Sequence, residues 1–161
     1  MTFTNVNNNQ AQMVKTFRGF NTDEQLALLW YAYTLVGDRI MPSANPSETG
    51  MPIAQALYDQ IAAASQDDQL KMQREIVASQ DTSISRTYGE MNSSAKLSLW
   101  YLLAQGIEQG EIIPVLEDFK QSDHAQPFLD QLKGIEFNDQ IMFLRSVVLP
   151  MGIGSPETTR V

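Results

Sequence analysis

The chain has 161 residues, no cysteine and a formal net charge of −8. The absence of cysteine excludes disulfides, iron–sulfur clusters and thiolate zinc sites, and the negative charge argues against binding to nucleic acid because it repels phosphate groups. The length suits one compact domain, and the longest apolar stretch, residues 26–36, is far shorter than the roughly 20 residues that span a bilayer. We therefore expect a soluble protein with no membrane span.

The first elements in chain order are an arm and a helix. Residues 1–11 are rich in Asn and Gln and predict a flexible N-terminal arm. A capping box formed by Thr22 and Gln25 predicts the start of a helix, in which apolar residues recur every three or four positions up to Gly37. This segment carries the first of two Trp-Tyr pairs.

The same helical periodicity continues along the chain. Helices are expected over 52–64, over 66–77 after a cap at Ser65, from a cap at Asn92 to Gly110, and from Asn138 to Pro150. No segment alternates apolar and polar residues with a period of two, so no sheet is expected. The pattern predicts an all-α fold over residues 12–151, followed by a polar tail or linker remnant over 152–161.

The two halves of the chain resemble each other at a constant offset. Residues 68–77 align with 139–148, and Trp30-Tyr31 aligns with Trp100-Tyr101 after deletion of one residue. Two related helical units packed face to face would place both aromatic pairs around one interior. Such an interior suits a long, flat, apolar ligand, although aromatic pairs on helices also serve as plain core packing.

The sequence offers no catalytic constellation. Its single histidine, His124, follows Asp123 in a polar loop, and one histidine neither builds a metal site nor singles out a serine nucleophile. No dinucleotide-binding, P-loop, HExxH or EF-hand spacing occurs. We expect a protein that is not an enzyme and binds no metal, with a hydrolase built on an unseen Ser-His pair as a remote alternative. Arg145 lies one helical turn from Ile141 and Val148 and has two interpretations: a buried, paired charge, which its repeat counterpart Arg74 supports, or a part of the ligand site.

Several motifs then resemble, in order, the N-terminal helical domain of the cyanobacterial orange carotenoid protein. They are EQLALLWYAY at 24–33, ISRTY at 84–88, KLSLWY at 96–101 and LRSVVLPMG at 144–152. The resemblance extends from about Phe17 to Gly152, so the chain looks like a stand-alone helical carotenoid protein. It implies two discontinuous, internally related four-helix bundles enclosing an apolar tunnel, and it makes residues 12–151 a carotenoid-binding domain.

The resemblance also implies the cofactor, a ketocarotenoid of the canthaxanthin or echinenone class that lies between the bundles. The positions that match the pigment contacts of the family are Leu26, Leu29, Trp30, Tyr33, Leu97, Trp100, Tyr101, Ala104, Ile107, Leu116, Phe119, Ile141, Arg145 and Val148. Four of these depart from the family: Ala104 replaces a glycine, Ile107 a methionine, Leu116 a proline and Phe119 a tyrosine. Arg145 matches an arginine implicated in docking to the phycobilisome.

The function that the resemblance implies is photoprotection. The pigment would release the energy of singlet oxygen or of an excited phycobilisome as heat, near the cytoplasmic face of the thylakoid membrane. The implied partners are the carotenoid, the phycobilisome and a carotenoid-donating homologue of the family's C-terminal domain. The alternative is a pigment-free helical interaction module, in which both Trp-Tyr pairs belong only to the core.

Overall fold

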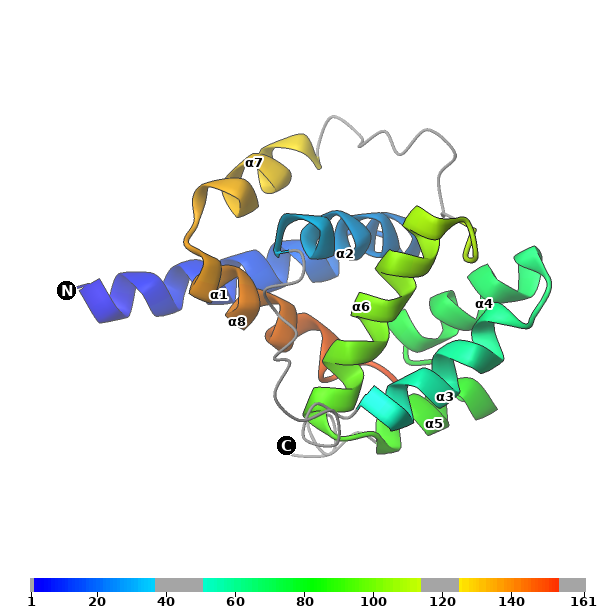
Figure 1. The fold of residues 1–161 in the computed structure, drawn as a ribbon. Helices are drawn as coiled ribbons and strands as arrows, with labels where there is room; N and C mark the ends of the chain where they lie inside the picture. The colour runs from blue at the N-terminus through cyan, green and yellow to red at the C-terminus, as the bar shows by residue number, and fades with distance from the viewer. Residues whose placement is uncertain (1, 37–50, 114–124, 154–161) are drawn as a thin grey trace.

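A computed structural model describes residues 2–36, 51–113 and 125–153. Over these ranges the chain forms eight α-helices and no strand, which confirms the all-α prediction (Figure 1). The helices are α1 (Thr2–Gly19), α2 (Thr22–Val36), α3 (Met51–Ala62), α4 (Gln66–Val77), α5 (Ser83–Glu90), α6 (Ser93–Gln109), α7 (Gln126–Gly134) and α8 (Phe137–Val148).

The helices pack as two groups of four, and each group combines helices from both halves of the chain. α1 and α2 pack with α7 and α8, while α3 and α4 pack with α5 and α6. α2 also contacts α4 and α6, and α8 contacts α6, so the two groups share one core. In Figure 1, α1 and α8 lie side by side, and α6 passes between α2 and α3. The first group is therefore discontinuous in the sequence.

The helix bounds agree with the internal repeat. α4 covers 66–77 and α8 covers 137–148, so both ends of α8 follow those of α4 at the offset that relates the two halves of the sequence. α2 begins at 22 and α6 at 93, which is the same offset again. The two Trp-Tyr pairs consequently lie on corresponding helices, and these two helices contact each other at the boundary between the groups.

Several helix ends form as the sequence predicts. Ser65 Oγ accepts a hydrogen bond from the Asp68 amide at 3.2 Å, and Asn92 Oδ1 accepts one from the Ala95 amide at 2.8 Å. Gly110 closes α6 with a φ of 82°, in the left-handed region that favours glycine. These caps satisfy amides that have no partner inside the helix.

Two predicted helix caps were wrong, by one position for α2 and by two positions for α8, whose N-cap is Glu136 instead of Asn138. The capping box of α2 is formed by Asn21 and Glu24: Asn21 Oδ1 accepts from the Glu24 amide at 2.8 Å, and Glu24 Oε1 accepts from the Asn21 amide at 3.2 Å. Asparagine is the stronger N-cap residue, so Thr22 is already helical. α8 begins at Phe137, which places Asn138 inside its first turn.

Three helices lie where the periodicity predicts none. Residues 2–11, the predicted arm, form the first half of α1, because no glycine or proline interrupts the chain before Gly19. α5 starts after the cap residue Thr82, whose Oγ1 accepts from the Ser85 amide at 3.3 Å. Pro127 lies in the first turn of α7, where its missing N–H costs nothing.

The end of the described chain closes the second group of helices. The Gly152 amide donates to the Ile76 carbonyl at 3.0 Å, and the Ile153 amide donates to the Ser85 carbonyl at 3.1 Å. A Cβ atom at Gly89 would lie 1.9 Å from the Ile153 carbonyl oxygen, so only glycine permits this approach.

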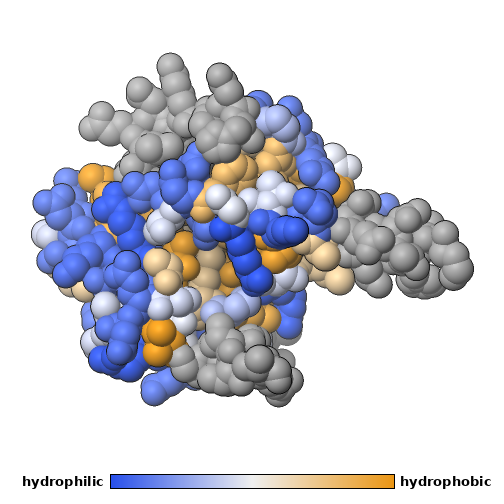
Figure 2. Space-filling view, turned by 180° about the vertical axis from the view of Figure 1, so that it is seen from behind, coloured by the Kyte–Doolittle hydropathy of each residue, from blue (hydrophilic) through white to orange (hydrophobic). Residues whose placement is uncertain are grey.

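The surface carries both hydrophilic and hydrophobic residues. Figure 2 shows hydrophilic residues over much of the opposite face, with hydrophobic residues gathered near its middle. Across the three described ranges, no helix combines the length and the hydropathy needed to cross a membrane.

Candidate functional site

A small cavity lies between α2, α4 and α6, with a volume of about 10 Å³, which is room for about one water molecule. α2 and α6 supply its walls with residues spaced three or four apart, so each helix turns one stripe toward it. The lining residues are Leu26, Leu29, Trp30, Tyr33, Gln73, Trp100, Leu103, Ala104 and Ile107. Eight of the nine lining residues are therefore aliphatic or aromatic, and both halves of the repeat contribute aromatic rings.

Two of the aromatic rings have their polar atoms bonded within the protein. Tyr33 is 2% exposed and its hydroxyl donates to the Leu97 carbonyl at 3.0 Å. Trp100 is 3% exposed and its Nε1 donates to the Tyr88 hydroxyl at 2.9 Å, with the two rings in an edge-to-face arrangement. Burial raises the pKa of Tyr33 far above its ordinary value, so this hydroxyl stays neutral. These bonds fix the orientation of both rings against the cavity.

Tyr88 anchors the wall behind Trp100. Its hydroxyl donates to the Val148 carbonyl at 2.5 Å, which ties α5 to the end of α8. Lys96 is also buried, and its Nζ donates to the Leu149 carbonyl at 2.9 Å. The end of α8 is therefore joined to α5 by Tyr88, which also contacts the lining residue Trp100, and to α6 by Lys96.

The structure brings seven of the predicted pigment contacts together in this cavity. They are Leu26, Leu29, Trp30, Tyr33, Trp100, Ala104 and Ile107. Leu97, Tyr101, Ile141 and Val148 are absent from its lining: the first three are half-buried against the core, and Val148 is fully buried within it. Leu116, Phe119 and the lone His124 lie outside the described residues.

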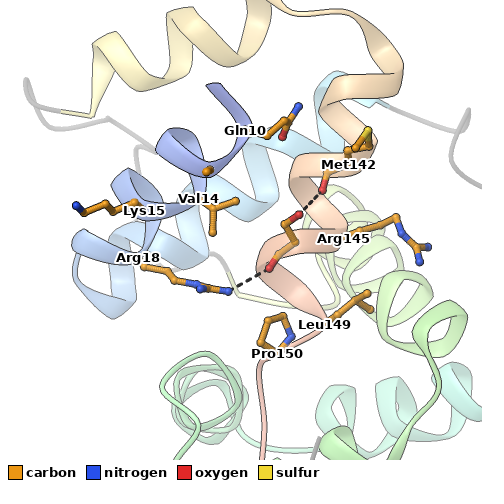
Figure 3. Close-up of a pocket in the computed structure, with 10 residues that line it drawn as sticks. Gln10, Val14, Lys15, Arg18, Met142, Arg145, Leu149 and Pro150 are labelled. Atoms are coloured by element: carbon orange, nitrogen blue, oxygen red, sulfur yellow. Dashed lines mark hydrogen bonds between the residues drawn. The ribbon is translucent and has the colours of Figure 1, made fainter. Parts of the chain in front are cut away.

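Arg145 lies apart from the cavity. It is exposed on α8 and borders an open groove between α1 and α8, with Lys15 and Arg18 on the α1 side (Figure 3). Figure 3 shows its side chain directed away from α1, whereas Arg18 reaches across the groove and donates to the Ser146 carbonyl at 3.2 Å.

The prediction that Arg145 and Arg74 are buried, paired charges was wrong for Arg145, which is exposed. Arg74 is half-buried and does form a pair, with Asp23, at 2.7 Å. α8 turns Leu144 and Val147 inward, and Arg145 follows Leu144 at the edge of this apolar stripe. Ile141, one turn before Arg145, is itself only half-buried.

Gln73 and Leu103 line the cavity but are missing from the predicted set. Leu103 follows Trp100 by three positions, so the periodicity of the helix contained the signal. Gln73 is 4% exposed in α4. A glutamine normally predicts an exposed position. The one sign in the sequence that Gln73 faces inward was its spacing of three residues from the apolar Ile76.

The fold and the cavity define a duplicated, all-helical domain with an aromatic-walled interior. The chain belongs to the family described as "Orange carotenoid protein, N-terminal", which matches residues 4–154. The family is named for carotenoid binding rather than for a catalysed reaction.

The relatives agree with this assignment. An orange carotenoid-binding domain-containing protein of Nostoc sp. strain PCC 7120 is 38% identical over 143 residues, covering 89% of this chain and 83% of the relative. The orange carotenoid-binding protein of Synechocystis sp. is 31% identical over 139 residues, and the chain spans 44% of its length.

Two solved structures are similar in fold. The red carotenoid protein of Anabaena (Nostoc) sp. PCC 7120, a structure with bound canthaxanthin, has a TM-score of 0.76 and 34% identity, covering 89% of this chain and 98% of that one. The orange carotenoid protein OCP1 of Fremyella diplosiphon has a TM-score of 0.79 and 28% identity, covering 95% of this chain and 47% of that one.

Proposed function

We propose that the chain binds a ketocarotenoid of the canthaxanthin or echinenone class between α2 and α6. The observation that carries this proposal is the cavity lined by corresponding helices of the repeat, with Trp30 on one and Trp100 on the other. The similar red carotenoid protein is described as binding canthaxanthin, which supports the choice of pigment.

The lining residues fit such a group chemically. Apolar side chains and aromatic faces suit a conjugated hydrocarbon, whose burial contributes roughly 25 cal/mol per Å² of apolar surface before the costs of association. Each aromatic contact adds roughly 0.5–1.5 kcal/mol. A cavity of about 10 Å³ is far smaller than the roughly 300–1,000 Å³ of ordinary ligand pockets, so the side chains between α2 and α6 have to move substantially to admit the pigment.

The half-buried Trp30 and Ile107 are the lining residues best placed to move. Leu97, Tyr101, Ile141 and Val148 then support the lining from behind, or contact a longer part of the polyene as the channel widens. Leu116 and Phe119 are proposed to contact one end ring of the pigment.

The proposed activity is photoprotection without bond chemistry. A bound polyene accepts energy from singlet oxygen or an excited phycobilisome and releases it as heat, while the protein holds and orients the pigment. In this proposal the chain is not an enzyme, and it works near the cytoplasmic face of the thylakoid membrane. The exposed Arg145 is proposed to contact the phycobilisome, and a homologue of the family's C-terminal domain to donate the pigment.

One observation favours a second candidate, a pigment-free interaction module. The cavity is small, and Tyr33 and Trp100 are almost fully buried against the protein, as core residues are. In this alternative the aromatic pairs stabilise the contact between the two groups of helices and bind no ligand.

A visible absorption spectrum separates the two candidates. The chain is purified from cells that make canthaxanthin, and its fold is checked by circular dichroism. A folded protein with a strong visible band supports pigment binding, whereas a folded but colourless protein contradicts it and favours the interaction module. Phycobilisome fluorescence measured with and without the coloured protein then distinguishes antenna quenching from scavenging of singlet oxygen.

A further inference from the structure

Gln73 is the one carboxamide in the lining of the cavity. The other eight lining residues are aliphatic or aromatic, and they come from α2 and α6, whereas Gln73 comes from α4. It is 4% exposed, so most of its side chain is removed from bulk water. Burying an amide costs free energy unless its donors and its acceptor form hydrogen bonds, so the hydrogen bonds of Gln73 decide whether its position is structural or serves a ligand.

Gln69, one turn earlier on α4, shows what full use of such an amide looks like. Its Nε2 donates to the carbonyls of Ala62 at 3.3 Å and Glu111 at 3.1 Å, and its Oε1 accepts from the Ile113 amide at 3.0 Å. Both donors and the acceptor form hydrogen bonds, and Gln69 therefore links α4 to the end of α3 and to the residues that follow α6.

Gln73 is used differently. Within the described ranges, its side chain makes a single hydrogen bond, from Nε2 to the Gln69 carbonyl at 3.2 Å. A carboxamide has two N–H donors and one acceptor oxygen. One N–H and the oxygen therefore have no hydrogen bond within these ranges, whereas Tyr33 and Trp100, which line the same cavity, have bonded their polar atoms to the protein.

We infer that Gln73 selects the pigment, by donating its second N–H to a carbonyl oxygen on an end ring of the carotenoid. This inference rests on the proposed function. Trp30 and Trp100 line the same cavity, and indole rings pack well against a conjugated ring such as a cyclohexenone. A hydrocarbon carotenoid leaves the buried amide without a partner, and sites built to hydrogen-bond a ligand reject analogues that lack the bonding group.

The test compares two pigments that differ in their ring carbonyls. The purified protein is offered equal amounts of canthaxanthin and β-carotene, and the bound pigments are extracted and quantified. The wild type is expected to retain canthaxanthin preferentially. Gln73→Met, which keeps the length of the side chain and removes the amide, is expected to lower that preference about tenfold, equal to about 1.4 kcal/mol. Total pigment binding should persist because the site stays apolar.

Gln140→Met is the matched control. Gln140 is also a buried glutamine, 7% exposed, and its Nε2 donates to the Leu132 carbonyl at 3.0 Å, but it is not part of the cavity lining. Its replacement is expected to reduce stability without changing the pigment ratio. A change as large as that of Gln73→Met would assign both effects to the fold and overturn the inference.

A second readout does not depend on how well any variant folds. The resonance Raman carbonyl band of canthaxanthin bound to the wild type should lie below its position in an aprotic solvent, as expected for a hydrogen-bonded ketone. An unshifted band, or equal pigment ratios for the wild type and Gln73→Met, overturns this inference and leaves the proposed function standing. A wild type that binds neither pigment overturns both.

Discussion

The two tryptophans of the cavity separate ligand binding from core packing, because they differ in burial. Trp100 is 3% exposed and bonded to Tyr88, whereas Trp30 is half-buried. Truncation of a buried tryptophan to alanine costs about 3–5 kcal/mol. For a domain of this size each kcal/mol lowers the melting temperature by about 2–4 °C, so Trp100→Ala should lower it by about 6–20 °C.

Trp30→Ala should cost less, about 1–2 kcal/mol, since less of its surface leaves water on folding. If both rings hold the pigment, both variants nevertheless lose pigment strongly. Melting followed by circular dichroism gives the first quantity, and the ratio of visible to 280 nm absorbance of the purified proteins, corrected for the lost indole, gives the second.

Stability and pigment retention, measured on both variants, together decide whether the tryptophans bind the pigment or only pack the core. Similar loss of pigment with unequal loss of stability is the expected pattern. If Trp30→Ala retains pigment as the wild type does while Trp100→Ala loses it only in proportion to unfolding, the rings act as core residues and the reasoning from the cavity is refuted.

Three further predictions follow from particular contacts. Gly89→Ala should lower the urea midpoint of unfolding by the equivalent of about 1–3 kcal/mol, because its Cβ would collide with the Ile153 carbonyl oxygen; a midpoint equal to that of the wild type would contradict the tight approach. Burial raises the pKa of Tyr33, and burial together with Glu111 raises that of Tyr58. The free energy of unfolding should therefore stay constant up to about pH 10, the pKa of tyrosine in the unfolded chain, and fall above it. A double variant, Tyr33→Phe with Tyr58→Phe, that shows the same fall at alkaline pH would exclude these two groups as its cause. Arg145→Glu should leave the free energy of unfolding within about 1 kcal/mol of the wild type, because the side chain is exposed, and should weaken phycobilisome quenching; undiminished quenching would remove Arg145 from the docking surface.

The sequence predicted those parts of the structure that depend on local periodicity. Leu26, Leu29, Trp30 and Tyr33 form a stripe on one helix whatever the tertiary fold, and the internal repeat placed an equivalent stripe on a second helix. Ser65, Asn92 and Gly110 act through bonds to residues a few positions away, so their roles could also be predicted.

What could not be predicted depends on contacts between distant segments. Arg145 has helical spacing to Ile141 and Val148, but whether that edge of α8 is covered depends on where α1 packs. Gln73 is polar, and only the approach of α2 and α6 makes its position interior. α5 is held by two hydrogen bonds, from the Tyr88 hydroxyl to the Val148 carbonyl and from the Ile153 amide to the Ser85 carbonyl. Val148 and Ile153 both lie far from α5 in the sequence.

The most direct test of the central claim is an experimental structure of the chain purified with its pigment. The account predicts a polyene lying between α2 and α6, in van der Waals contact with Trp30 and Trp100, with the interior widened far beyond its present volume of about 10 Å³. A pigment lying instead in the open groove between α1 and α8, with those two rings still packed against the protein, would contradict it.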